Sequence, residues 1–184
     1  MKAFRKVILS EKGQSLIELG LSLPLLFLLV LGGIEFSNMI DAYLGLVHLT
    51  REGANMTSRG TPADVGGPNY GAPDDALDVI VVSSAPVVTP GNLSQWTIIH
   101  SRIGPGPNDD EYIVLEQITR GALGEPSQIG SKDETPNLPN IDNIGTGQEL
   151  HAVEVYYQYN TITPVGNFLG FLVADNLFYE RTVF

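Results

Sequence analysis

The sequence has no cysteine and only three histidines, which excludes several kinds of functional site. Without cysteine the chain forms no disulfide bond, offers no thiol nucleophile and has no thiolate metal ligand. The histidines at positions 48, 100 and 151 are too far apart for a helical zinc-binding pair. Spacing reveals no Ser-His-Asp arrangement, phosphate-binding loop or dinucleotide fingerprint. We therefore expect no catalytic residue, no cofactor and no metal site, and a protein that is not an enzyme.

Basic residues are also scarce, and their distribution is uneven. Ten Lys and Arg stand against 21 Asp and Glu, giving a net charge of −11, and such a surface repels nucleic acid. Residues 1–13 are the exception, because they hold Lys2, Arg5, Lys6 and Lys12 against a single acid, Glu11. A basic segment before an apolar run stays in the cytoplasm, so the rest of the chain is expected to cross the membrane.

The apolar run extends from Leu19 to Ile34 without a charged residue. These sixteen residues span about 24 Å as a helix, and a few flanking residues extend the run to the ~30 Å of a bilayer core. A cleavable secretory signal is disfavoured because the run is long and no small-x-small site follows it. We expect a single-pass membrane protein whose C-terminal domain lies outside the cytoplasm.

Helical spacing continues beyond the apolar run. We predict one helix from about Ser15 to Arg59, with a membrane half at about 14–36 and an amphipathic half at about 37–59. Pro24 is expected to kink the membrane half, and Gly60-Thr-Pro62 to end the helix. The predicted apolar stripe of the second half comprises Phe36, Met39, Ile40, Tyr43, Leu44, Val47 and Met56.

A carboxylate, Glu18, stands near the start of the membrane helix, where a charged group is costly. A generic anchor gains nothing from it. If a peptidase cuts between Gly13 and Gln14, however, Gln14 acquires a free ammonium group and Glu18 becomes the fifth residue. The ammonium of one subunit can then meet the carboxylate of its neighbour, so that each offsets the other's desolvation.

The stretch GQSLIELGLSLPLLFLLVLGGIEF, continuing to LTREGANMTSRG, resembles the TadE-like pseudopilins of tight-adherence pilus systems. Family features stand at Leu23–Leu26, Glu35-Phe36 and Arg51–Ala54, within residues 13–60. The resemblance implies that Gly13 and Gln14 flank the processing site and that Glu18 serves recognition and assembly. It also implies a type IV pilin-like protein of the bacterial inner membrane. Its expected partners are a prepilin peptidase, other pilin or pseudopilin subunits, the inner-membrane assembly platform and the lipid bilayer. Glu35 is interpreted as a boundary acid without a function.

We divide the chain into a leader at 1–13, the N-terminal helix at 14–59 and an extracytoplasmic α+β domain at 60–184. This domain is expected to pack the helix on an antiparallel sheet of about four strands. The strands are predicted at 95–103, 111–120, 150–159 and 178–184, with a helix at 165–176. Residues 76–83 are compatible with a helix or a strand, and the polar loop 121–148 is either functional or mobile.

Other polar groups of the domain are given structural interpretations. The acids Asp74, Asp75 and Asp78, and the run 108–111, are interpreted as solvated turns, because neither has EF-hand spacing. Tyr156, Tyr157 and Tyr159 are assigned to sheet packing, and His100 and His151 to structural roles.

The leading hypothesis is a minor pilin or pseudopilin that acts in pilus biogenesis, secretion and surface attachment. The alternatives are an unprocessed, signal-anchored binding or adhesin domain, and an anchored hydrolase.

Overall fold

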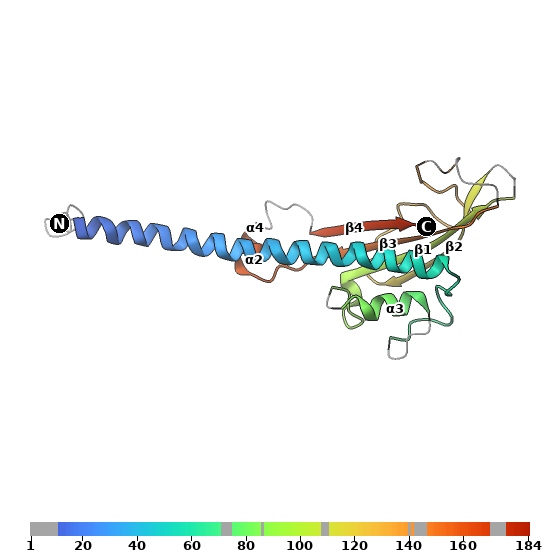
Figure 1. Cartoon of the computed structure of the whole chain (residues 1–184), viewed down its shortest axis with the longest axis horizontal. Helices are drawn as coiled ribbons and strands as arrows, with labels where there is room; N and C mark the ends of the chain where they lie inside the picture. The colour runs from blue at the N-terminus through green and yellow to red at the C-terminus, as the bar shows by residue number, and fades with distance from the viewer. Residues whose placement is uncertain are drawn as a thin grey trace. The chain divides into compact units, whose positions relative to one another are not determined.

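A computed structural model describes residues 11–70, 75–85, 87–107, 111–139, 141, 147–169 and 176–184 (Figure 1). The chain divides into two compact units. One unit comprises Met1–Ile40 and Asn160–Ala174, and the other comprises Asp41–Tyr159 and Asp175–Phe184. Residues 1–10 of the basic leader, the acid Asp74 and residues 108–110 of the second acidic run lie outside the described residues.

The longest element is helix α2, Glu11–Ser58 (blue to cyan in Figure 1). It confirms the single long helix predicted from the sequence, although it begins four residues earlier and ends one residue earlier. Pro24 lies inside the helix without interrupting it. The kink expected there stays a prediction.

The first unit contains α2 as far as Ile40, a turn, and the short helix α4, Pro164–Leu169. Proline suits the first helical position, since its missing N–H would have no partner there. Thr163 precedes it, and its hydroxyl accepts a hydrogen bond from the Gly166 N–H at 3.1 Å, as an N-cap residue does. Part of the predicted 165–176 helix is therefore confirmed, and residues 170–175 lie outside the described residues.

The second unit contains a four-stranded antiparallel sheet in the order β2-β1-β3-β4 (Figure 1). Its strands are β1 Trp96–Pro105, β2 Tyr112–Gly121, β3 Leu150–Gln158 and β4 Leu177–Val183. The short 3₁₀ helix η1, Leu93–Gln95, precedes β1. This arrangement confirms the predicted α+β fold.

One face of the sheet is covered by the C-terminal part of α2 and by helix α3, Ala76–Ser83. The structure thus resolves the 76–83 ambiguity in favour of a helix, and Asp75 caps it by accepting from the Asp78 N–H at 2.8 Å. The buried residues of α2 in this unit, apart from glycine, are Ala42, Leu46, Leu49, Thr50, Ala54 and Thr57.

The predicted apolar stripe of α2 is wrong in part, because Met39, Val47 and Met56 are half-buried but its other four members are exposed. Phe36, Ile40, Tyr43 and Leu44 are each more than 40% exposed, whereas Leu46 and Ala54 are fully buried. The buried face of α2 in this unit combines Leu46 and Leu49 with alanines and threonines, so large apolar residues stand on both faces of the helix and their pattern does not mark the buried one.

The other face of the sheet is covered by the segment 122–139 rather than by a helix. Ile129 of this segment is fully buried with Ile103, Val114 and Ala152. Glu154 of β3, also fully buried, accepts hydrogen bonds from the Ser127 hydroxyl, the Gln128 N–H at 2.9 Å and the Tyr179 hydroxyl at 2.8 Å. This segment is therefore part of the core.

Candidate functional site

The predicted processing and assembly residues all lie on the first part of α2. The Gly13–Gln14 bond falls in the first turn of the helix, and Gln14 and Glu18 are both exposed. They are four residues apart, so they lie on the same face of the helix about one turn from each other. The structure thus places Gly13, Gln14, Glu18 and Pro24 on one continuous element, and their roles remain predictions.

The helix that carries these residues is apolar and uncovered. Its most hydropathic window has a mean hydropathy of 2.2, and none of that window is buried in the protein. Among the described residues it is the one helix long and apolar enough to cross a membrane. A core helix of a soluble protein buries such a window, so this composition fits a single-pass membrane protein.

At the far end of the uncharged run, Glu35 is only 3% exposed. Its carboxylate accepts three hydrogen bonds from the turn before α4. Oε1 receives the Ile162 N–H at 3.2 Å, while Oε2 receives the Thr163 N–H at 2.8 Å and the Thr163 hydroxyl at 2.7 Å. Such bonds to a charged acceptor are stronger than those between neutral groups.

The fit around Glu35 is close. A Cβ atom added to Gly166 would lie 2.6 Å from Glu35 Cδ, so this position suits glycine alone. The sequence-based interpretation of Glu35 as a boundary acid without a function missed these contacts. Its partners are separated from it by 127 and 128 residues, and no local pattern connects them.

The Arg51–Ala54 segment also has a structural explanation. Gly53 and Ala54 are buried, whereas Arg51 and Glu52 are exposed. A Cβ atom at Gly53 would collide with Ile80 Cδ1 of α3 and approach Val153 Cγ2 of β3 to 3.3 Å. The glycine therefore permits α2, α3 and the sheet to meet closely.

A buried ionic cluster lies beside α3, where a solvated acidic turn was expected. Asp75 and Asp78 are fully buried, and Arg120 at the end of β2 is 7% exposed. The Arg120 Nη2 atom lies 2.7 Å from Asp64 Oδ1 and 3.8 Å from Asp75 Oδ2, and its Nε atom lies 3.7 Å from Asp78 Oδ1. The interpretation of Asp75 and Asp78 as solvated residues is thus wrong.

The cluster fixes the loop that follows α2. Asp64 also accepts from the N–H groups of Gly66 and Gly67, and the bond from Arg120 is the main reason that its pKa falls to about 2. The Arg120 guanidinium thus lies near all three carboxylates, and this internal ion-pair network ties the loop to β2.

Two histidines meet on the sheet face that α2 covers. His100 Nε2 and His151 Nδ1 are 3.2 Å apart, and the rings stack with centroids 5.4 Å apart. They line a cavity of about 340 Å³ together with Arg102, which pairs with Glu116 at 3.3 Å and Glu149 at 3.2 Å. Burial is the main cause that lowers the pKa of His100 to about 4, so the pair is uncharged at neutral pH.

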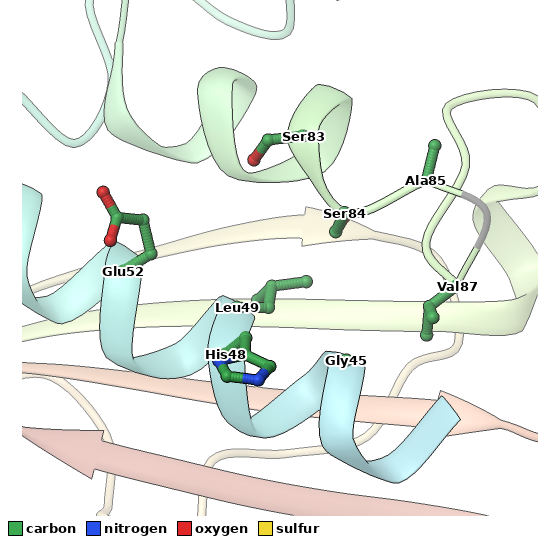
Figure 2. Close-up of a pocket in the computed structure, with 8 residues that line it drawn as sticks. All are labelled: Gly45, His48, Leu49, Glu52, Ser83, Ser84, Ala85 and Val87. Carbon is green, nitrogen blue, oxygen red and sulfur yellow. The ribbon is translucent and has the colours of Figure 1, made fainter. Parts of the chain in front are cut away.

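A second cavity, of about 400 Å³, opens between α2 and the end of α3 (Figure 2). Figure 2 shows His48 and Glu52 on α2, with Ser83, Ser84 and Val87 across from them. The side chains form no nucleophile–base pair, and the described part of the chain contains no group of three His, Asp or Glu that could hold a metal ion. The expectation that the protein is not an enzyme stays a prediction.

Comparison with known proteins finds a similarity in the N-terminal helix. A family model described as TadE-like protein matches residues 13–55. Over this segment the chain is similar to TadE-like proteins. The match begins at Gly13 and covers Glu18, Pro24, Glu35 and the Arg51–Ala54 segment. No curated protein and no solved structure matches the chain. The similarity to TadE-like proteins is therefore one of the N-terminal helix, which is also the candidate membrane helix.

Proposed function

We propose that this chain is a minor pilin or pseudopilin of a tight-adherence pilus or secretion system. A prepilin peptidase removes residues 1–13, and the mature subunit enters the assembly through α2. The observation that carries the proposal is an apolar, uncovered helix with a single charge, Glu18, inside its span. Membrane anchorage alone gives no reason for that carboxylate.

Assembly of subunits gives the Glu18 carboxylate a role that membrane anchorage does not. After cleavage, the new α-amino group of Gln14 lies about one helical turn from Glu18 on the same subunit, and both residues are exposed. An ammonium and a carboxylate that pair in an apolar assembly offset the desolvation cost that either would suffer alone. The proposal assigns the chain no catalytic reaction, and its work is pilus biogenesis and surface attachment.

Processing is tested by the intact mass of the protein from membranes of cells that contain an active prepilin peptidase. The expected mass lacks residues 1–13, and Gly13→Val should retain them because a branched side chain hinders the peptidase. Gly20→Val is the matched control, since an added Cβ at Gly20 meets no atom within 4 Å. Wild-type protein that keeps Met1 would instead support an unprocessed, anchored binding or adhesin domain.

Assembly is tested separately with Glu18→Gln, which keeps the size of the side chain and removes its charge. Incorporation into sheared pili should fall sharply while the amount of protein in the membrane stays unchanged. Asp41→Asn, an exposed acid farther along the same helix, should incorporate normally. Normal incorporation of Glu18→Gln would show that the carboxylate has no part in assembly.

A further inference from the structure

The position of Glu35 along α2 fixes its depth if the helix crosses the bilayer, an assumption taken from the proposed function. Lys12 and Glu35 are separated by 23 residues, which is about 35 Å of helix, slightly more than the ~30 Å of a hydrocarbon core. With the basic leader at the cytoplasmic surface, Glu35 reaches the outer boundary of the core. A carboxylate at that depth loses part of its hydration.

The turn 160–166 compensates for this loss of hydration. Its backbone and hydroxyl donors at Ile162 and Thr163 take the place of water around the Glu35 carboxylate. Because these bonds are 2.7 to 3.2 Å long, the turn must lie at the same depth as Glu35. Glu35 and the turn belong to the same compact unit.

The outer surface of this turn is suited to lipid. Residues 160–169 contain no charged side chain. Ile162 is 65% exposed although its N–H is bound to Glu35, so its apolar side chain points away from the protein at the level of the boundary. A large exposed apolar side chain beside a membrane helix is stabilised by contact with the acyl chains.

We propose that the turn 160–166 is a second membrane contact, which Glu35 holds against the outer leaflet of the bilayer. The chain thus touches the membrane at two places that are far apart in sequence, the α2 span and this turn. Glu35 is the positioning residue, because its three hydrogen bonds determine the depth of Ile162.

The test uses the absence of cysteine, which makes any introduced cysteine a unique labelling site. Full-length protein is reconstituted in phosphatidylcholine and phosphatidylglycerol vesicles, and a nitroxide is attached at Ile162→Cys. Depth is measured as the ratio of its accessibility to oxygen and to a water-soluble nickel complex. Leu26→Cys within the span and Val65→Cys in the other unit, both exposed, are the lipid and water references.

The proposal expects the ratio at Ile162 to fall between those of the two references. Adding Glu35→Ala should shift the Ile162 ratio to the value at Val65, and Glu52→Ala, at an exposed acid of α2, should not. An Ile162 ratio equal to that of Val65, with Leu26 still in lipid, would overturn the second contact and leave the span intact. A water-like ratio at Leu26 would reject the membrane span itself, and with it both proposals.

Discussion

Acid should destabilise the second unit through His100, and this effect can be calculated from the structure. His100 is 2% exposed, and its neighbours on the sheet are His151 and Arg102, which faces Glu116 and Glu149. Burial, followed by His151 and Arg102, lowers its pKa from 6.5 to about 4. Replacement by glutamine, His100→Gln, removes the titration and keeps a polar side chain.

The direction in which the unfolding free energy changes with pH follows from proton binding in the two states. Between pH 6.5 and pH 4 the unfolded chain protonates His100 and the folded chain does not, so stability falls as the pH falls through this window. At 1.36 kcal/mol per pKa unit, His100 removes about 2 kcal/mol of the unfolding free energy between pH 7 and pH 5. Asp64, whose pKa is lowered to about 2, acts only at lower pH, because its stabilising contribution is lost below its unfolded pKa of 3.8.

The assay is urea unfolding of the full chain in detergent micelles at pH 7 and pH 5. Trp96 is the only tryptophan, is fully buried and lies on the same strand as His100, so its fluorescence reports on this unit. A loss of about 2 kcal/mol corresponds to a midpoint shift of roughly 1 M urea for a protein of this size.

The decisive comparison is between the pH responses of the variants. The midpoint of His100→Gln should shift by much less than that of the wild-type protein, and His48→Gln, at an exposed histidine, should behave as wild type. Equal shifts in wild type and His100→Gln would refute the reasoning, because the acid sensitivity would then come from other groups.

The remaining predictions use the same unfolding measurement at pH 7. Arg120→Met strands buried carboxylates and should cost about 3 kcal/mol, whereas Arg102→Met, which breaks exposed pairs, should cost less than about 1 kcal/mol. Gly53→Val should cost about 1 to 3 kcal/mol through overpacking, while Gly33→Val, with no neighbour within 4 Å, should be neutral. Glu154→Gln should cost about 2 kcal/mol because three donors lose a charged acceptor. Equal effects in either matched pair, or no loss in Glu154→Gln, would contradict these assignments.

The elements of the fold were predictable because their signals are local. The alternation in β3 placed Val153 and Tyr156 on opposite faces, and the structure confirms this. Val153 lies near Gly53 of α2, and the Tyr156 hydroxyl donates to the Pro126 carbonyl on the other side at 2.8 Å. The tyrosines pack against β4 as expected, since Tyr156 and Tyr179 have ring centroids 4.8 Å apart.

The domain-facing side of α2 was not predictable from hydropathy. Beside Leu46 and Leu49 it consists of small residues and threonines, such as Thr50, whose hydroxyl accepts from the Thr182 hydroxyl at 3.0 Å. Other large apolar side chains, such as those of Ile40 and Leu44, are exposed, so a search for an apolar stripe did not single out the buried face. Tyr43 shows why exposure alone misleads, since it is 43% exposed yet donates to Glu180 at 3.0 Å.

Long-range polar contacts were missed for a related reason. The partners of Glu35 and of the aspartates beside α3 come from distant segments, and a carboxylate in a single sequence carries no sign of its partner. In the N-terminal helix, by contrast, Gly13, Gln14, Glu18 and Pro24 were selected by spacing and resemblance. The family match covers all four positions, although their roles await the processing and assembly experiments.

The segment 122–139 has a practical consequence for anyone who shortens or engineers the chain. Its composition, rich in Pro, Gly and Ser, is the usual sign of a spacer that tolerates deletion, tag insertion or protease cleavage. Yet its Ile129 is part of the hydrophobic core, and its Gln128 N–H donates a hydrogen bond to the buried carboxylate of Glu154 on β3. Trimming it would therefore remove one wall of the domain, and epitope tags belong instead at sites where the backbone is solvated on all sides.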